Sequence, residues 1–200
     1  MSADAESWAP GGPHDRAHAW DLLVEHNESD SLRKHGLAVE ASMRGFARRY
    51  GEDEELWGIV GLIHDFDYEK HPDPLEHGLA GGRILRELGW PDVITHAVES
   101  HNDHVGVLRE NLMEQVLFSS DELTGFIVAV ALVKGRDLTL VEARSVHKKM
   151  RDKGFARSVS RDDIEKGWRQ LGADPDEHIG FIVESLKAVD KEIGLTHSEY

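Results

Sequence analysis

The sequence of 200 residues contains no cysteine, and this absence excludes several kinds of site. Without thiols the chain has no disulfide bond, no thiolate metal ligand and no cysteine nucleophile. A catalytic metal would therefore depend on nitrogen and oxygen ligands. A chain without disulfides suits a reducing compartment, and we expect a cytoplasmic protein.

Positive charge is also scarce. The chain has 23 Lys and Arg against 38 Asp and Glu, which gives a formal net charge of −15 with histidine neutral. A protein that binds nucleic acid in general needs basic surface to displace the counterions of the phosphate backbone. We therefore expect no general nucleic-acid binding.

Long apolar runs are missing as well. Acidic and amide residues interrupt the most apolar stretch, 112–133, and leave 11 uncharged residues from Leu123 to Val133. That run is too short to span a bilayer, and residues 1–9 have neither the basic region nor the apolar run of a signal peptide. We expect no membrane association. The sequence gives no indication of the oligomeric state.

Apolar residues recur at intervals of three and four from Ala17 onward, which is typical of amphipathic helices. No alternating pattern is long enough to predict a strand, so the predicted fold class is all-α, a compact single-domain helical bundle. We expect a loose tail over 1–14, a helical core over 15–135, and C-terminal helices over 136–200 that pack on the same domain. The predicted helices are 16–27, 31–50, 53–66, 76–89, 92–104, 108–134, 139–152, 161–171 and 175–194.

Several imidazole and carboxylate groups fall on the apolar faces of these helices. His35 shares a face with Leu32, Val39 and Met43, and a lone histidine there is more often a hydrogen-bonded core residue than a ligand. His77 and His101 occupy similar positions on their helices, and His64 and Asp65 follow directly after an apolar run.

Asp121 is the sharpest case, because apolar residues flank it at helical spacing. A lone buried carboxylate costs several kcal/mol, so it needs an ion-pair partner, a helix-end hydrogen bond or a metal ion. Packing alone does not explain four imidazoles and two carboxylates on inward faces. These donors favour Mn, Fe, Zn, Co or Ni over Mg or Ca, and six ligands are enough for one or two ions.

The order and spacing of these residues resemble the HD-domain superfamily of metal-dependent phosphohydrolases. His35, the pair His64 and Asp65, and Asp121 are similar to its H…HD…D signature. His77 and His101 match the two extra histidines of its two-metal members. The resemblance spans about residues 32–133. Phe66 and Asp67 stand where the related HDIG form has Ile and Gly, Asn102 stands where the cyclic-dinucleotide phosphodiesterase branch has a second histidine, and the glycine-tyrosine-proline motif of that branch is absent.

The resemblance implies hydrolysis of a small phosphate ester or nucleotide by a metal-bound hydroxide. It implies that His35, His64, Asp65 and Asp121 hold one ion, and that Asp65 bridges to a second ion held by His77 and His101. A di-iron oxygenase of the same superfamily and a non-catalytic metal or nucleotide sensor are the alternatives. Ligand type alone does not separate these three functions.

Two further sets of residues are candidates for contacts with a small anionic phosphorylated substrate. Asp67 and Glu69 follow the HD pair and would lie at the rim of the site, where with Asp65 they could act in proton transfer. The segment 148–161 carries a net charge of +5 while the rest of the chain carries −20. Its residues Lys149, Lys153 and Arg157 could bind the substrate phosphate, or the segment could be a solvated surface.

Overall fold

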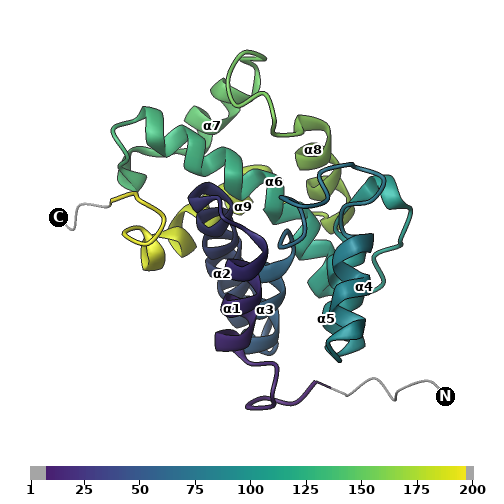
Figure 1. Ribbon diagram of the computed structural model, residues 1–200. Helices are drawn as coiled ribbons and strands as arrows, with labels where there is room; N and C mark the ends of the chain where they lie inside the picture. Colours follow the sequence, from purple (N-terminus) through teal and green to yellow (C-terminus); the bar gives the residue numbers. More distant parts are fainter. Residues whose placement is uncertain (1–7, 197–200) are drawn as a thin grey trace.

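The computed structural model describes residues 8–196, which form a bundle of α-helices (Figure 1). Within this range the helices are α1 (Arg16–His26), α2 (Asp30–Tyr50), α3 (Glu54–Ile63), α4 (Leu79–Glu87), α5 (Asp92–Ser100), α6 (Leu112–Val133), α7 (Ala143–Met150), α8 (Arg161–Leu171) and α9 (Pro175–Leu186), with 3-10 turns at Asp103–Val105, Leu138–Leu140 and Lys187–Val189. The all-α prediction is confirmed, and each predicted helix has a counterpart in the structure.

Helices α2 and α3 pack with their backbones very close together. A Cβ atom on Gly36 of α2 would lie 2.6 Å from the carbonyl oxygen of Leu62 in α3. Carbon atoms do not approach an oxygen so closely without displacement, so this contact requires glycine. The close contact brings His35 of α2 next to the end of α3, where His64 lies.

Helix α6 crosses the middle of the bundle and contacts α2, α5, α7, α8 and α9 (Figure 1). By length and composition alone it could cross a membrane, but 61% of its most apolar window is buried inside the structure. The helix continues without a break through Asp121 and Glu122, the residues that interrupt its apolar run. Its apolar character is therefore that expected of a central core helix.

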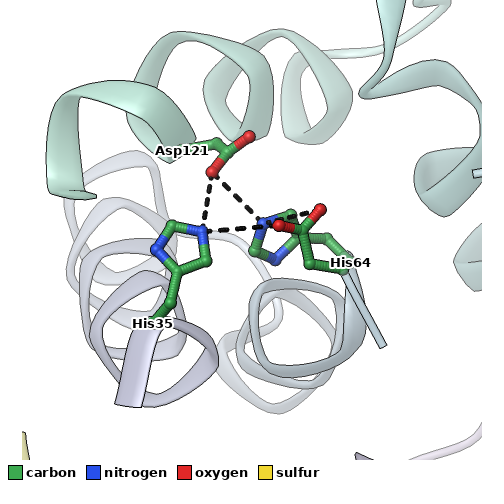
Figure 2. A group of neighbouring side chains, drawn as sticks. His35, His64 and Asp121 are labelled. Carbon is green, nitrogen blue, oxygen red and sulfur yellow. Dashed lines mark hydrogen bonds and ion pairs between the residues drawn. The ribbon is translucent and has the colours of Figure 1, made fainter. Parts of the chain in front are cut away.

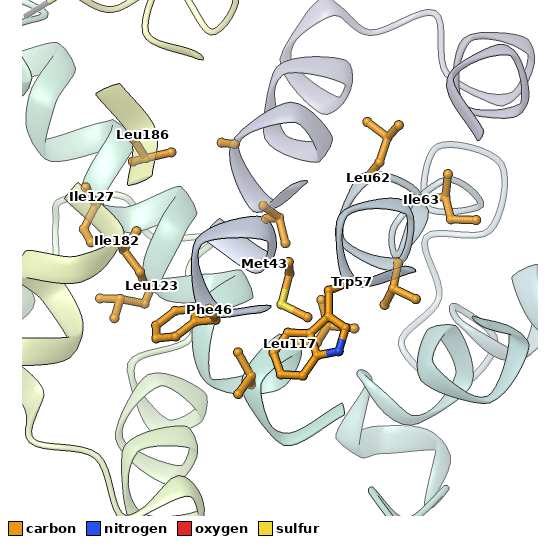
Figure 3. Packing of buried hydrophobic residues seen from close by; sticks show 14 of the residues in the cluster. Met43, Phe46, Trp57, Leu62, Ile63, Leu117, Leu123, Ile127, Ile182 and Leu186 are labelled. Carbon is orange, nitrogen blue, oxygen red and sulfur yellow. The ribbon is translucent and has the colours of Figure 1, made fainter. Parts of the chain in front are cut away.

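One buried apolar cluster fills the bundle, and Figure 3 shows part of it. The cluster includes Met43 and Phe46 of α2, Leu123 of α6, and Ile182 and Leu186 of α9. Burial of such side chains is the main favourable contribution to folding. The helices after residue 136 thus share one core with the helices before it.

Side-chain caps fix the starts of several helices, among them α3, α8 and α9. Asp53, Ser160 and Asp174 each accept hydrogen bonds from backbone N–H groups in the first turn of α3, α8 and α9. Pro175 follows Asp174 at the first helical position, where its missing N–H has no consequence. Serine and aspartate are common residues at this position, because their side-chain oxygens accept hydrogen bonds from free N–H groups of the first turn.

Most predicted helices are too long, by up to eight residues at the end of α9. Gly78 has a φ of 84°, which lies outside the right-handed helical region, and α4 therefore begins after it. Likewise α3 stops before His64 and α5 stops before His101. His64 and His101 therefore lie at helix ends, and His77 lies in the turn before α4. None of the three lies on the helical face predicted for it.

The predicted tail over 1–14 is only partly described by the structure, because residues 1–7 lie outside the described range. Residues 8–14 have no helix, yet they contact the bundle. Nε1 of Trp8 donates a hydrogen bond to the carboxylate of Asp53 at 2.8 Å. The ring of His14 packs on Trp90 with centroids 4.7 Å apart. This part of the segment is therefore attached to the helices rather than loose.

Candidate metal centre

Side chains from separate elements meet at one point between α2, α3 and α6 (Figure 2). Oδ1 of Asp121 lies 2.9 Å from Nε2 of His35 and 3.2 Å from Nε2 of His64. Oδ2 of Asp65 lies 3.7 Å from Nε2 of His35. Each of these four residues offers one ligand atom, and all four atoms lie within 4.8 Å of one another. We call them the first ligand group.

A second ligand group consists of Asp65, His77 and His101. Oδ1 of Asp65 lies 2.9 Å from Nε2 of His77 and 3.1 Å from Nε2 of His101. The two imidazole nitrogens are 3.0 Å apart. Asp65 thus belongs to both groups. Its Oδ2 faces His35, and its Oδ1 faces the pair of histidines and also lies 3.5 Å from Nε2 of His64.

The orientation of two imidazoles is fixed by the helices they follow. Nδ1 of His64 donates to the carbonyl oxygen of Gly61 at 2.8 Å, and Nδ1 of His101 donates to that of Val98 at 2.6 Å. Both acceptors lie three residues earlier, at the C-terminal end of α3 and α5. A proton held on Nδ1 leaves Nε2 as the lone-pair nitrogen that a metal ion needs.

His77 is held by a carboxylate instead of a carbonyl group. Its Nδ1 lies 3.0 Å from Oδ1 of Asp67. Oδ2 of Asp67 accepts hydrogen bonds from the backbone N–H groups of Gly78 and Gly81 at the start of α4, at 2.9 and 2.8 Å. Asp67 is fully buried. The prediction that it lies at the rim of the site was wrong, because these contacts draw it inward.

Glu69 does not lie at the rim of the site either. Its side chain is exposed, and its Oε2 accepts a hydrogen bond from the backbone N–H of Ser29, at the start of α2, at 3.2 Å. The glutamate therefore faces a helix end on the surface. Its predicted part in proton transfer has no support in this geometry.

Imidazoles and carboxylates lie close together in both ligand groups and shift the pKa values of one another. Burial alone lowers the pKa of His64, but the carboxylates of Asp65 and Asp121 raise it to about 9. Burial opposes protonation of His77 in the same way, and its contacts with Asp65 and Asp67 raise its pKa to about 10. Burial raises the pKa of Asp121, yet the neighbouring imidazoles hold it below its usual range. Protons on the imidazoles thus balance the buried carboxylates.

The donor set fits a divalent transition metal. Imidazole nitrogen combined with carboxylate oxygen suits Mn, Fe, Co, Ni and Zn, whereas Mg and Ca prefer oxygen alone. A cation could take the place of the protons that now balance the carboxylates, because metal binding releases ligand protons. The two ligand groups, joined through Asp65, give room for two ions.

Comparison with known families supports the same site. Residues 32–124 match the HD domain family. The chain carries an HD domain. HD domains are in general metal-dependent phosphohydrolases, and the matched range includes all six residues of the two ligand groups.

Similarity to a curated protein extends over part of the chain. The chain is 33% identical over 101 residues to the uncharacterized protein MJ0778 of Methanocaldococcus jannaschii. This match covers 50% of the present chain and 56% of the relative, so the similarity spans about half of each protein. No solved structure gives a significant match.

A cavity of about 690 Å³ opens above the ligands of the HD domain. Five ligands form its floor, and the turns after α3 and α5 and one face of α6 form part of its wall. The remaining wall consists of residues that follow the HD domain, namely Ala156, Ser158, Val159, Ser160 and Asp163. The C-terminal part of the chain therefore helps to shape the space next to the candidate metal centre.

The three basic residues predicted to bind phosphate do not line this cavity. Helix α7 ends at Met150, so Lys153 lies in the turn beyond it and shares no helical face with Lys149. Nζ of Lys149 lies 4.5 Å from the ring centroid of Phe155, a cation–π contact. Lys153 and Arg157 are exposed. The predicted phosphate site is thus not formed around the HD-domain ligands.

Two residues near the ligands of the HD domain were not predicted. Nδ2 of Asn102 donates to the carbonyl oxygens of Pro74 and His77 at 2.7 and 2.9 Å, which ties the turn before α4 to the end of α5. Its position directly after His101 was the available signal. Glu122 lines the cavity beside Asp121, and burial, with the nearby carboxylates, raises its pKa to about 8. The signal for Glu122 in the sequence was a second acidic residue directly after Asp121 on the same apolar helix.

Proposed function

We propose that this protein is a metal-dependent phosphohydrolase that cleaves a small phosphate ester. The observation that carries the proposal is the shared carboxylate of Asp65, which joins two imidazole-rich ligand groups at the floor of an open cavity. The HD domain over residues 32–124 supports the same reaction class.

In this proposal His35, His64, Asp65 and Asp121 hold one divalent ion, and Asp65, His77 and His101 hold a second. Two such ions lower the pKa of a water molecule and neutralise charge on the phosphoryl oxygens when they are bound. Mn, Fe, Zn, Co and Ni suit the donors better than Mg.

The residues around the ligands have positioning parts in the proposal. Carbonyl groups at the ends of α3 and α5 hold His64 and His101 with Nε2 toward the floor of the cavity. Asp67 does the same for His77. Fixed ligands need no reorganisation when substrate binds, which lowers the cost of reaching the transition state. We also propose a cytoplasmic location, supported by the burial of the apolar helix α6 in the core.

The test is a phosphate-release assay on purified protein loaded separately with each of the five metals. Wild-type protein should release inorganic phosphate from at least one ester in a panel of sugar, nucleoside and amino-alcohol phosphates. The Asp65→Asn variant should be inactive, and Asp162→Asn, which changes an exposed acid on α8, should match the wild type. Oxygen uptake that depends on substrate, with no phosphate release under any metal, would favour a di-iron oxygenase and overturn the proposal.

A further inference from the structure

A loop that follows the HD domain forms part of the cavity wall. The loop covers residues 151–160 and joins α7 to α8 (Figure 1). Four of its residues line the cavity, namely Ala156, Ser158, Val159 and Ser160. None of the four side chains carries a charge, so the loop offers methyl groups and hydroxyl groups to a bound molecule. We call residues 155–160 the wall segment.

Arg161, the first residue of α8, holds the wall segment without lining the cavity itself. Its guanidinium donates hydrogen bonds to the backbone carbonyl groups of Phe155, Ala156 and Val159. The same group lies 4.7 Å from the ring centroid of Phe126 on α6, a cation–π contact. Arginine can bond several carbonyl groups at once because its N–H donors form a planar fork. One side chain thus connects the wall segment to both α8 and α6.

The backbone of the wall segment has a conformation that needs such support. Ala156 has a φ of 40°, in the left-handed region that residues with a Cβ atom rarely adopt. Phe155 packs edge-on against Phe126 with ring centroids 5.5 Å apart, and Nζ of Lys149 lies 4.5 Å from the centroid of Phe155. A rarely adopted conformation persists where surrounding contacts maintain it, and such places are frequent at ligand sites. The contacts of Arg161 and Phe155 provide this maintenance.

One face of α6 continues the wall beside this segment. Phe118, Gly125 and Ala129 line the cavity and lie on one side of the helix, seven and then four residues apart. Glu122 lies on the same face, and its Oε2 accepts a hydrogen bond from the backbone N–H of Ser160 at 3.1 Å. This hydrogen bond fixes the wall segment relative to α6. Apolar groups from two elements therefore border the space next to the ligand groups.

We infer that the wall segment contacts the organic part of the substrate, and that Arg161 is the positioning residue that maintains this contact. The inference rests on the proposed function for the place of the phosphate, at the two ligand groups. With the phosphate there, the organic group of the ester occupies the cavity and packs against the wall segment and α6. Recognition of that group therefore depends on residues that follow the HD domain. Arg161 acts through the wall segment and touches neither substrate nor metal.

Two phosphonates that differ in their organic group test this inference through binding alone. Methylphosphonate and phenylphosphonate have the same type of anionic head group, and neither has an ester bond to hydrolyse. Calorimetry on the manganese-loaded protein measures both dissociation constants. We expect phenylphosphonate to bind at least about tenfold more tightly, because its ring reaches the apolar groups of the wall and the methyl group does not.

Four variants then locate the source of this preference. Arg161→Gln removes the cation and most of its N–H donors, so the two affinities should come within about threefold of each other. Arg161→Lys keeps the charge and some donors and should retain more of the preference than Arg161→Gln. Val159→Ala shortens a side chain of the wall itself and should also lower the preference. Arg157→Gln is the matched control, because Arg157 is an exposed residue of the wall segment that does not line the cavity.

The outcomes separate this inference from a purely structural role and from the proposed function. Positioning predicts that methylphosphonate affinity and bound metal stay at the wild-type values in each variant, whereas a general structural defect would weaken both ligands alike. Circular dichroism checks folding, and if Arg161→Gln is unfolded, Arg161→Lys and Val159→Ala decide. Equal affinities in the wild type, no binding of either phosphonate, or a preference that the folded variants keep would each overturn the inference. Loss of the preference without phosphate release from any ester would contradict only the phosphohydrolase.

Discussion

Asp65 joins the two halves of the candidate metal centre, because its carboxylate lies next to imidazoles of both ligand groups. Oδ2 faces His35, and Oδ1 faces His77, His101 and, at 3.5 Å, His64. Asp121 contacts only the first ligand group. Asp65 therefore belongs to two ligand groups and Asp121 to one, although both are part of the HD-domain signature.

This inequality predicts different metal contents for two variants. Asp65→Asn weakens both ligand groups and should leave the purified protein with almost no bound metal. Asp121→Asn removes one ligand of the first group only, so about one ion per chain should remain. Elemental analysis after gel filtration measures the ratio. Equal ratios in the two variants would show that Asp65 does not bridge.

The raised pKa values of His64 and His77 predict a strong dependence of metal affinity on pH. Both imidazoles are protonated at pH 7.5 in the metal-free protein, since their pKa values are about 9 and about 10. A metal ion binds the neutral ring, so binding should release about two protons per fully loaded chain. Affinity should rise from pH 7 and level off above pH 10.

Calorimetry in buffers of different ionisation enthalpy measures this release. Repeating the titration with His77→Gln should reduce the number of protons by about one, because the group with the higher pKa is gone. Affinity that stays constant between pH 7 and pH 9 would contradict the proposed ligand role of these histidines.

At the level of elements, helix ends matter more to the site than helix faces. His64 and His101 each follow the last residue of a helix and bond back to its final carbonyls, while His77 precedes α4. A helical face spreads side chains along 1.5 Å steps. Helix ends instead allow several elements to converge on one small volume, as they do here around Asp65.

The turn between α3 and α4 depends on Asp67, which gives a prediction of stability. Asp67→Ala removes the acceptor for two backbone N–H groups and the contact with His77, all in a buried place. We expect the free energy of unfolding to fall by about 3 kcal/mol. Glu69→Ala, in the same turn but exposed, should change it by less than about 0.5 kcal/mol. Urea denaturation of the metal-free variants provides both values.

Sequence patterns were sufficient for the number and order of helices, because caps and apolar periodicity are local signals. Asp174 with Pro175 is such a signal for α9. Patterns were insufficient at the helix ends. The conformation of Gly78 makes α4 begin later than predicted, and α7 ends at Met150, so Lys153 lies outside the helix. The pairing of Asp67 with His77 is a tertiary contact that no local pattern encodes.

The candidate ligands were predictable for a different reason. Carboxylates and imidazoles on apolar faces conflict with hydrophobic packing, and Asp121 within α6 is the clearest example. The wall of the cavity was less predictable, because residues such as Asp163 reach it only through the packing of α8 on α6. Charge alone pointed to the lysines near residue 150 as candidates, and these residues do not line the cavity.

For the whole molecule, the HD domain and the later helices form one core, so a ligand at the floor of the cavity should stabilise the entire bundle. Manganese at about 100 times its dissociation constant should raise the free energy of unfolding by about 2.7 kcal/mol. A chelator should reverse the change. Thermal unfolding with and without manganese measures the effect, and the Asp65→Asn variant should show little response to the metal. A melting temperature of the wild type that changes with neither metal nor chelator would contradict the metal centre.

The distance along the chain between ligands carries a consequence for how the protein matures. Asp65, His77 and His101 lie within 36 residues of one another, whereas Asp121 contacts His35 across 86 residues. Contacts of short sequence separation form early, and long loops close late. During synthesis on the ribosome, which begins at the N-terminus, the second ligand group is complete before α6 has emerged. A nascent chain could thus capture its first ion through the local triad, ahead of the ion that α6 helps to hold.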